Sequence, residues 1–442
     1  MWGLLTVLAG NMLIDALEVS ALMVATPAIS AELGLSPAAG QWTLTAFALG
    51  FGGLMLFGGR LVALLGRRRC YLIALLVFAA ASMIAGTSDS VEPLIATRLV
   101  KGFCAALTAP TGLAIITTRF AEGTDRARAI SVYTLFGTSG FTAGLLASGL
   151  LTEVDWRWTL AFPAPVVLVL FAAGLVLIPR DPPAPGPAPL DLAGAWTFVG
   201  ALFALVYTVS AVPSTGWTSA RVLVGLVTAV VLAVACWLIE RGARAPLLDA
   251  GVLRHRPLLL AALGAASLNG SYLGLLFILS NELQAQEKWT PTRTALAFLP
   301  ACLPPAVTAL RSGRLVARWG APRLIPLGAL AAFLGYLWFL RASAPLSYAV
   351  DLLPTLVLVG FAFVVSFAAL NAQATGTVPA ESRTVASATY QTAVQVGAAL
   401  VLVLVAALLT VYRPAVRPAA IVVACVGLAG VLVGSAGRKP RP

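Results

Sequence analysis

Charge is scarce in this sequence. Only 10% of its 442 residues are Asp, Glu, Lys or Arg, whereas a soluble globular protein carries about 25%. Hydrophobic residues make up 60%, so too few polar side chains remain to cover a surface that faces water. The composition excludes an ordinary soluble domain and predicts that most of the outer surface contacts lipid.

Histidine and paired cysteines are also lacking. His255 is the one histidine, and the five cysteines are scattered singly through apolar segments without a C-x-x-C pair. This pattern argues against a metal site or a disulfide framework, and the sequence has no glycine-rich phosphate loop. We therefore expect no enzymatic activity and no bound cofactor. The net charge of +12 lies in short segments between apolar runs, so we expect no nucleic-acid partner.

Long apolar runs fill the chain. A membrane-spanning helix needs about 20 mostly apolar residues, and fourteen runs meet this need. They cover residues 3–29, 40–61, 70–87, 93–118, 128–152, 157–178, 191–211, 220–240, 257–282, 292–312, 321–341, 346–376, 383–411 and 417–436. The fold class predicted is an all-α integral membrane protein with fourteen transmembrane helices.

The basic residues alternate between the segments that join these runs. Twenty Lys and Arg residues fall on one side of the expected membrane and seven on the other. Because basic residues are retained on the cytoplasmic side, both termini are expected in the cytoplasm.

One phrase occurs twice. Gly59-Arg60-Leu61-Val62-Ala63 recurs as Gly313-Arg314-Leu315-Val316-Ala317, and each copy is followed by a glycine (Gly66, Gly320) and an arginine (Arg69, Arg323). The copies follow spans two and ten, which indicates a duplication with two spans inserted between the halves. The predicted units are a six-helix half (1–178), a Pro-rich linker with two helices and an Arg-rich loop (179–256), and a second six-helix half (257–442).

The ordered set of motifs resembles the major facilitator superfamily, and within it the fourteen-helix drug:proton antiporters. Gly59, Leu61, Gly66, Arg67 and Arg68 match the signature of the loop after helix two. The aspartate that the family carries in this signature is Ala63 here, and Ala317 in the second copy. Because that aspartate helps to lock the outward-facing state in the family, we expect a weaker cytoplasmic lock.

Further motifs occur at the expected helices. Arg98 and Gly102 match the helix-four element, with Lys101 in place of a glutamine. Helix five carries Gly137, Gly140, Gly144 and Gly149, with Leu145 and Ser148 departing from the antiporter pattern. The family's Trp-Arg-Trp is present at 156–158, and Glu18 followed by Pro27 resembles its acidic motif in helix one.

Four ionisable residues stand out deep inside predicted spans: Asp15 and Glu18 in helix one, and Arg98 and Lys101 in helix four. Such residues cost roughly 2.5–3.5 kcal/mol each in a bilayer, and the i, i+3 spacing puts each pair on one helix face. Desolvation raises the pKa of a carboxylic acid and a neighbouring cation lowers it. We expect Glu18 to be the main proton carrier, Asp15 its assistant, and Arg98 and Lys101 the charge-switch partners; a permanent ion-pair staple is the alternative.

Polar residues in later spans are candidates for a substrate cavity or for contacts between helices: Asn269, Tyr272, Asn371, Gln373, Gln391 and Gln395. The small residues of helix five, Gly140 and Gly144 among them, are expected mainly to allow close helix packing.

The resemblance implies alternating access in a bacterial plasma membrane. We expect a monomer, embedded in lipid, that exports a hydrophobic drug or secondary metabolite, with the proton gradient as its energy source and no cofactor. Two positive and two negative buried groups suit neutral, zwitterionic or weakly charged substrates better than dications. An importer or facilitator of an organic solute, and a non-transporting scaffold, are the alternatives.

Overall fold

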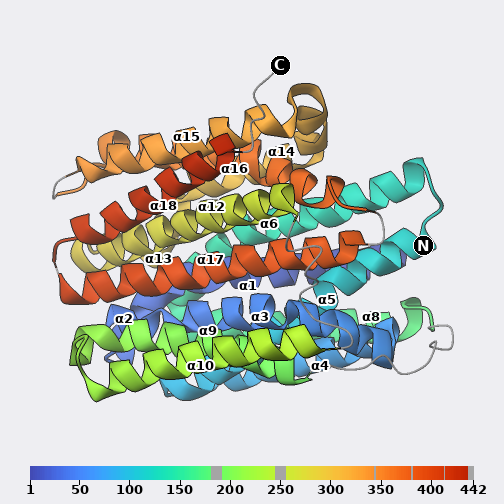
Figure 1. Ribbon diagram of the computed structural model, residues 1–442, viewed down its shortest axis with the longest axis horizontal. Helices are drawn as coiled ribbons and strands as arrows, with labels where there is room; N and C mark the ends of the chain where they lie inside the picture. Colours follow the sequence, from blue (N-terminus) through green and yellow to red (C-terminus); the bar gives the residue numbers. More distant parts are fainter. Residues whose placement is uncertain (181–191, 244–254, 343–344, 380–381, 413, 437–442) are drawn as a thin grey trace.

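The computed structural model describes all residues except 181–191, 244–254, 343–344, 380–381, 413 and 437–442. Within the described residues every regular element is helical, and the helices run side by side along one axis (Figure 1). Thirteen helices are long and apolar enough to cross a membrane, and a pair bent by 56° makes up to fourteen. The predicted all-α membrane fold is confirmed.

The first six predicted spans correspond to eight helices. They are α1 (Trp2–Glu32), α2 (Pro37–Gly40) with α3 (Trp42–Leu65), α4 (Arg67–Gly86), α5 (Val91–Arg119), α6 (Thr124–Val154), and α7 (Trp156–Ala161) with α8 (Pro163–Leu177). Spans seven and eight are α9 (Leu192–Thr215) and α10 (Ala220–Gly242). Most of the predicted Pro-rich linker and of the predicted Arg-rich loop, residues 181–191 and 244–254, lies outside the described residues.

The last six spans begin with α12 (Arg256–Asn281), which continues into the π-helical turn η1 (Glu282–Gln286). The others are α13 (Pro291–Ala297) with α14 (Leu299–Trp319), α15 (Ala321–Leu340), η2 (Tyr348–Leu352) with α16 (Leu353–Gly376), α17 (Arg383–Val411) and α18 (Arg417–Ala436). The bent pair is α13–α14, where Pro300 follows the break at Phe298. Because proline has no backbone N–H and blocks the preceding turn, the bend there has a local cause.

The repeated phrase lies inside helices, not in a loop. The sequence predicts spans that end at residues 61 and 312, but α3 continues to Leu65 and α14 to Trp319. These boundaries are wrong because nothing breaks either helix before its glycine. Gly66 (φ 89°, ψ 151°) and Gly320 (φ 76°, ψ 143°) then adopt nearly the same positive-φ conformation, which a side chain would strain. The duplication is therefore repeated in backbone geometry as well as in sequence.

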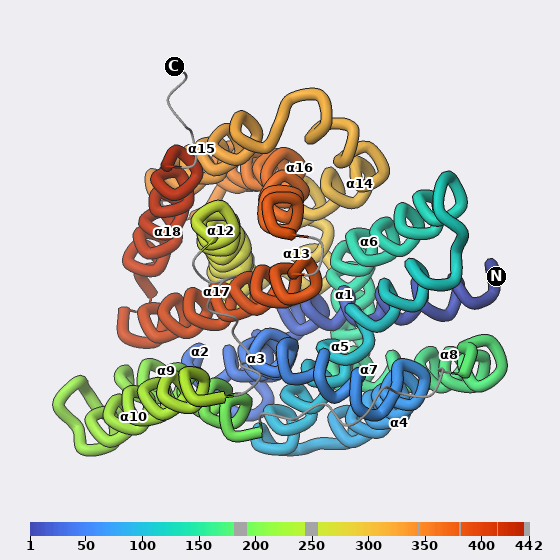
Figure 2. The backbone as a smooth tube through the Cα atoms, turned by 45° about the vertical axis from the view of Figure 1, so that its right-hand side comes forward, coloured from blue at the N-terminus to red at the C-terminus, as the bar shows by residue number. Residues whose placement is uncertain are grey.

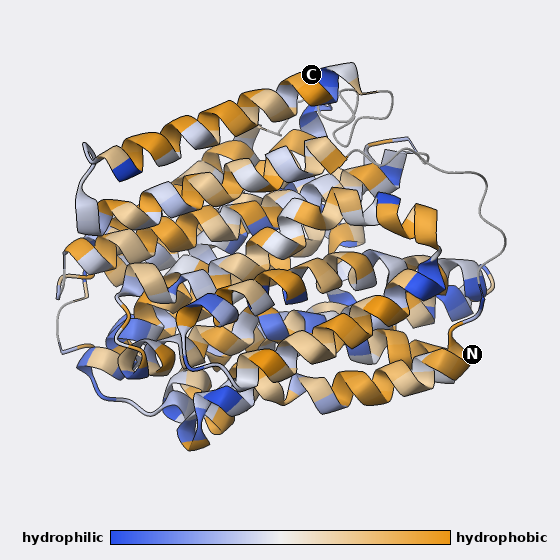
Figure 3. Ribbon diagram, turned by 90° about the horizontal axis from the view of Figure 1, so that it is seen from below, coloured by the Kyte–Doolittle hydropathy of each residue, from blue (hydrophilic) through white to orange (hydrophobic). Residues whose placement is uncertain are grey.

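The two ends of the bundle differ in charge. We call the end with the turns at Gly66, 120–123 and Gly320 the basic end, and the other the opposite end. Polar residues gather toward the ends of the bundle, and its sides are largely apolar (Figure 3). On α10, for example, Val224, Val230 and Trp237 are exposed, as expected for side chains that face lipid.

The two six-helix halves meet in the middle of the bundle and toward the opposite end. On α12 every residue from Gly270 to Asn281 is buried, whereas on α14 no residue after Ala306 is. Five described hydrogen bonds join the halves, among them Gln284 Nε2 to the Val24 carbonyl at 3.0 Å. The others link Ala38 to Thr410, Thr142 to Cys302, Thr292 to Glu153 and Thr392 to Gly52.

The α9–α10 hairpin lies beside the junction of the halves. One apolar cluster joins Trp42 and Leu49 of α3, Val206 of α9, and Ala399 and Val403 of α17. The α10 helix packs on the outer side of α9, away from the other helices (Figure 2). The hairpin therefore contacts both halves along one seam.

Candidate functional site: a buried charge cluster

Glu18 of α1 sits between two cations of α5. Both oxygens of its carboxylate are used: Oε2 pairs with the Arg98 guanidinium, and Oε1 lies 2.5 Å from Lys101 Nζ. All three residues are at most 1% exposed. The i, i+3 spacing of Arg98 and Lys101 explains how one carboxylate meets both, because the two side chains leave the same face of α5.

Arg98 also fixes the backbone around the cluster. Its Nη2 donates to the Glu18 carbonyl at 2.9 Å, and its Nε donates to the Thr43 carbonyl of α3 at 2.8 Å. The guanidinium carbon lies 4.6 Å from the centroid of the Phe47 ring, and Lys101 Nζ lies 4.9 Å from that of Phe78. A planar guanidinium with five donors suits this bridging role, so Arg98 ties α1, α3 and α5 together.

Asp15 lies one turn from Glu18 in a different environment. It is 2% exposed. Its Oδ2 accepts hydrogen bonds from Thr108 Oγ1 at 2.8 Å and Asn11 Nδ2 at 2.9 Å. Its Oδ1 has no hydrogen-bond partner, and the carboxylate forms no ion pair with any described residue. The structure therefore brings both predicted cations to Glu18 and leaves Asp15 with neutral donors only.

The predicted glycines of α6 hold α1 in place. A Cβ on Gly140 would lie 2.8 Å from the Ala16 Cβ, and one on Gly144 would lie 2.5 Å from the Leu17 carbonyl oxygen. Ser20 Oγ donates to the Phe141 carbonyl at 2.7 Å across the same contact. Close packing of α1 on α6 thus positions the acidic face of α1 toward α5, as the small-residue spacing predicts.

The polar candidates of the second half divide into two groups. Asn269 Nδ2 donates to the Val394 carbonyl at 3.2 Å, and Gln373 Nε2 donates to the Pro257 carbonyl at 3.0 Å. Both therefore join helices. Gln395 is buried on α17 against Gly52. Asn371 and Gln391 are half-buried, as are Asn269 and Gln373.

Tyr272 belongs to a row of aromatic rings that the sequence does not reveal. Its ring centroid lies 5.6 Å from that of Phe141 and 4.4 Å from that of Phe363. The row continues through Phe367 to Tyr390 with centroid separations of 5.6 and 6.3 Å. Phe141 belongs to the first half and the other four to the second, so the row crosses between the halves. The i, i+4 spacing of Phe363 and Phe367 is the one local signal for it.

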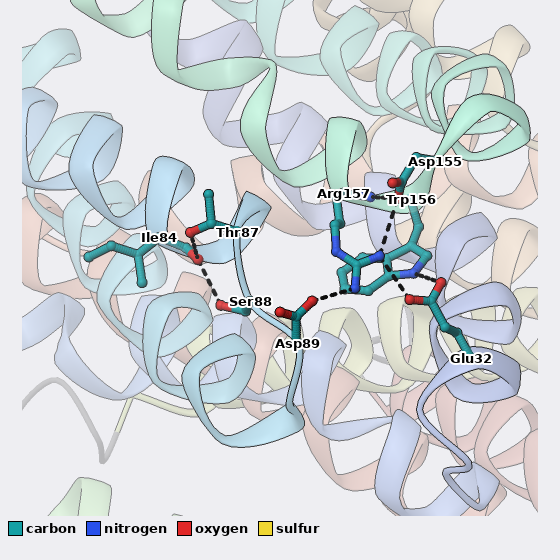
Figure 4. Close-up of polar contacts among 8 residues, drawn as sticks. All are labelled: Glu32, Ile84, Thr87, Ser88, Asp89, Asp155, Trp156 and Arg157. Carbon is teal, nitrogen blue, oxygen red and sulfur yellow. Dashed lines mark hydrogen bonds and ion pairs between the residues drawn. The ribbon is translucent and has the colours of Figure 1, made fainter.

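A second ionic network lies at the opposite end, and the predicted Trp-Arg-Trp motif supplies its centre (Figure 4). Arg157 pairs with Glu32 at 2.8 Å, with Asp89 at 2.7 Å and with Asp155 at 3.6 Å. Trp156 Nε1 donates to Glu32 at 2.7 Å. This network ties the end of α1 to the α4–α5 turn and to α7, all within the first half. Sequence reasoning missed Glu32 and Asp89 because their only signal is position at a helix end.

The arginines of the first repeated copy serve local roles. Arg68 donates to the carbonyls of Leu175 and Ile178 at 2.5 Å each. These are among the last carbonyls of α8, so Arg68 caps that helix end. Arg67 contacts Thr118 Oγ1 at 3.3 Å, while Arg69 and Arg314 are exposed at the basic end. A Cβ added at Gly59 or at Gly313 would have no other heavy atom within 4 Å.

In the described part of the chain, no three His, Cys, Asp or Glu side chains gather as metal ligands. The ionisable groups of the site are the carboxylates of Asp15 and Glu18 and the cations of Arg98 and Lys101. A buried carboxylate can bind or release a proton, and nearby cations alter the free energy of that step. Its burial between helices of a membrane bundle matches the setting in which ionisable residues serve transport.

Comparison with known proteins agrees with this architecture. A puromycin resistance protein of Streptomyces alboniger is 37% identical over 408 residues, which are 90% of this chain and 80% of that protein. A cephamycin export protein of Amycolatopsis lactamdurans is 35% identical over 73% of this chain and 67% of its own length. An uncharacterized MFS-type transporter of Mycobacterium tuberculosis, EfpA, is 31% identical over 75% of this chain, which spans only 61% of that protein.

Solved structures share the fold. A peptide transporter in complex with sulfate has a TM-score of 0.69 and 15% identity, with coverage of 98% of this chain and 92% of the other. At that identity the similarity concerns the fold alone. The family model of the Major Facilitator Superfamily matches residues 8–402. The resemblance seen in the motifs is confirmed: the chain belongs to the major facilitator superfamily of multi-pass membrane transporters.

Proposed function

We propose that this chain exports a hydrophobic or amphipathic antibiotic-like molecule across a bacterial plasma membrane in exchange for protons. The buried cluster of Glu18, Arg98 and Lys101, with Asp15 beside it, carries the proposal. Four ionisable residues in one membrane-embedded region would be costly without a role in moving charge. A proton gradient then supplies the energy, with about 2.3 kcal/mol for each charge moved through 100 mV.

The relatives support an antibiotic as the substrate. One relative is named for puromycin resistance and another for cephamycin export, and they match 90% and 73% of this chain. The aromatic row between the halves supports a substrate with a planar apolar part, because aromatic faces stack well on one another. Two acids and two bases in the cluster favour a neutral, zwitterionic or weakly charged molecule over a dication.

The proposed mechanism is alternating access. The halves 1–178 and 257–442 would rock about the middle of the bundle, where the aromatic row and the charge cluster lie. We place the basic end in the cytoplasm, with both termini there, because the sequence puts twenty basic residues on that side and seven on the other. We further propose that the protein works as a monomer surrounded by lipid.

Accumulation of puromycin in cells tests the proposal. Cells that express the protein should accumulate less radiolabelled puromycin than cells with an empty vector, and an uncoupler should abolish the difference. Efflux that persists unchanged with the uncoupler would contradict proton exchange. Higher accumulation in expressing cells would instead support an importer, the alternative that the departures at Leu145 and Ser148 from the antiporter motif leave open.

A matched comparison tests substrate charge. The same cells are loaded with a dicationic dye or with a neutral hydrophobic antibiotic. Export of the neutral compound should exceed that of the dication, and the reverse order would refute the argument from the cluster.

A further inference from the structure

The two buried carboxylates of α1 differ in how their charge is balanced. Glu18 contacts two cations, one through each oxygen. Asp15 contacts a hydroxyl and an amide, both through Oδ2, and its Oδ1 is buried without a partner. A buried ion is stable only when it is paired and its hydrogen-bonding capacity is filled. Each carboxylate has one oxygen without a hydrogen bond, Oε1 of Glu18 and Oδ1 of Asp15. Glu18 is nevertheless paired with two cations, whereas Asp15 has no cation partner among the described residues.

We propose that Asp15, not Glu18, is the carboxyl group that takes up and releases the coupled proton. This inference rests on the proposed proton exchange and names the group that carries it out. It reverses the division of roles that the sequence motif favours, in which Glu18 is the main carrier. Glu18 then serves as a permanent anion that positions Arg98 and Lys101.

The proton has a defined place on Asp15. With two donors already on Oδ2, the free oxygen is Oδ1, so protonation converts the carboxylate to a carboxylic acid with its O–H at Oδ1. No donor is displaced in this step, because Thr108 and Asn11 stay on Oδ2. Release of the proton restores the carboxylate, and the transfer needs no other reactant.

The surroundings favour both states of Asp15 by opposing effects. The hydrogen bonds that Thr108 and Asn11 donate to Oδ2 favour the anion. Burial favours the neutral acid. The other titratable groups that face Asp15 are uncharged when protonated: Cys104 on α5, Tyr71 on α4 and Tyr133 on α6. A carboxyl group between two such opposing effects can change its protonation state.

Two variants of the full-length protein separate the carboxylates. Asp15→Asn keeps the shape and the acceptor for Thr108 but cannot bind a proton. Glu18→Gln combined with Lys101→Met removes one anion and one cation together, which limits the misfolding expected from unpaired charge. Glu122→Gln is the matched control, since its carboxylate is 87% exposed in a pair with Arg126.

The first readout is puromycin transport in proteoliposomes. For Asp15→Asn, we expect accumulation driven by a pH gradient to fall at least tenfold, while puromycin exchange without a gradient stays within about twofold of wild type. Glu122→Gln should match wild type in both. Gradient-driven accumulation that survives in Asp15→Asn overturns the proposal. If the pH gradient does not change puromycin accumulation by the wild-type protein, the proposed function is wrong. The second readout then identifies the proton-binding residue without any transport measurement.

The second readout needs no substrate. Infrared difference spectra of the purified protein between acid and alkaline pH report the C=O band of a protonated carboxylic acid. The component of this band that comes from the buried carboxylic acid, apart from the contribution of the exposed Asp and Glu side chains, should vanish in Asp15→Asn and persist in the Glu18→Gln/Lys101→Met variant. A buried-acid component that persists in Asp15→Asn and vanishes in the double variant would assign the proton to Glu18 and refute the inference.

Discussion

The substitution Glu18→Gln should destabilise the protein severely. It leaves Arg98 and Lys101, each at most 1% exposed, without their shared anion. Removal of one partner from a buried ion pair costs about 3–5 kcal/mol. Because Glu18 serves two cations, we expect a loss at the upper part of this range, which is more than a 1,000-fold change in the unfolding equilibrium at about 1.4 kcal/mol per tenfold.

Reversible unfolding in mixed micelles, titrated with a denaturing detergent, measures this loss. The ten tryptophans supply the fluorescence signal. Glu122→Gln makes the same chemical change in an exposed pair and should cost under about 1 kcal/mol. Addition of Lys101→Met to Glu18→Gln should recover part of the loss, because one unpaired cation disappears. The reasoning is refuted if Glu18→Gln unfolds within about 1 kcal/mol of wild type, or if the second substitution adds to the damage.

Three further substitutions test the packing of α1 on α6, a contact between the halves and the missing motif aspartate. Gly59→Ala is the control for the first. Gly144→Ala should cost about 1–3 kcal/mol of stability and slow transport, because its Cβ would lie 2.5 Å from a backbone oxygen of α1, whereas Gly59→Ala, in open space, should do neither. Equal effects would contradict close packing. Glu153→Ala removes an acceptor for the backbone of α13, so maleimide should label a cysteine at the buried Thr294 faster, in a background without native cysteines. Unchanged labelling would show that the contact between Glu153 and the Thr292 backbone does not hold the two halves together. Ala63→Asp should restore the family's cytoplasmic lock and raise the outward-facing population by cysteine accessibility; no rise would show that the missing aspartate has no such role.

Much of the fold follows from local sequence. Each apolar run forms a helix because a chain in lipid must satisfy its own backbone hydrogen bonds. The predicted ends at residues 61 and 312 were early because hydropathy declines before the helix stops. Backbone conformation, set by Gly66 and Gly320, determines the true ends.

The site was predictable only in part. Spacing within one helix places Asp15 and Glu18 on one face, and Arg98 and Lys101 on another. Which cation meets which carboxylate depends on how α1 crosses α5, and that crossing is set by contacts far apart in sequence. The partners Asn11 and Thr108 of Asp15 were missed for the same reason, since neither belongs to a motif.

The aromatic row required the assembled structure as well. Phe141 meets Tyr272 only because the halves come together, and no spacing within either half encodes that contact. For Asn269 and Gln373 the sequence left a cavity role and a contact between helices equally open. In the structure their amides donate to the Val394 and Pro257 carbonyls, which are contacts between helices.

The two halves contact each other along two lateral seams, and the α9–α10 hairpin packs over only one of them. On one side α9 packs on both α3 and α17, and a single apolar cluster spans the three helices (Figure 2). On the other side α6 meets α14, and among the described helices only the short α13 also packs against both. Among the described helices, α9 therefore covers the α3–α17 contact from the lipid, and no helix outside the two halves covers the α6–α14 contact. In the proposed alternating access, movement of the halves would shear α9 against α3 or α17, so the hairpin would limit the direction in which the bundle can open.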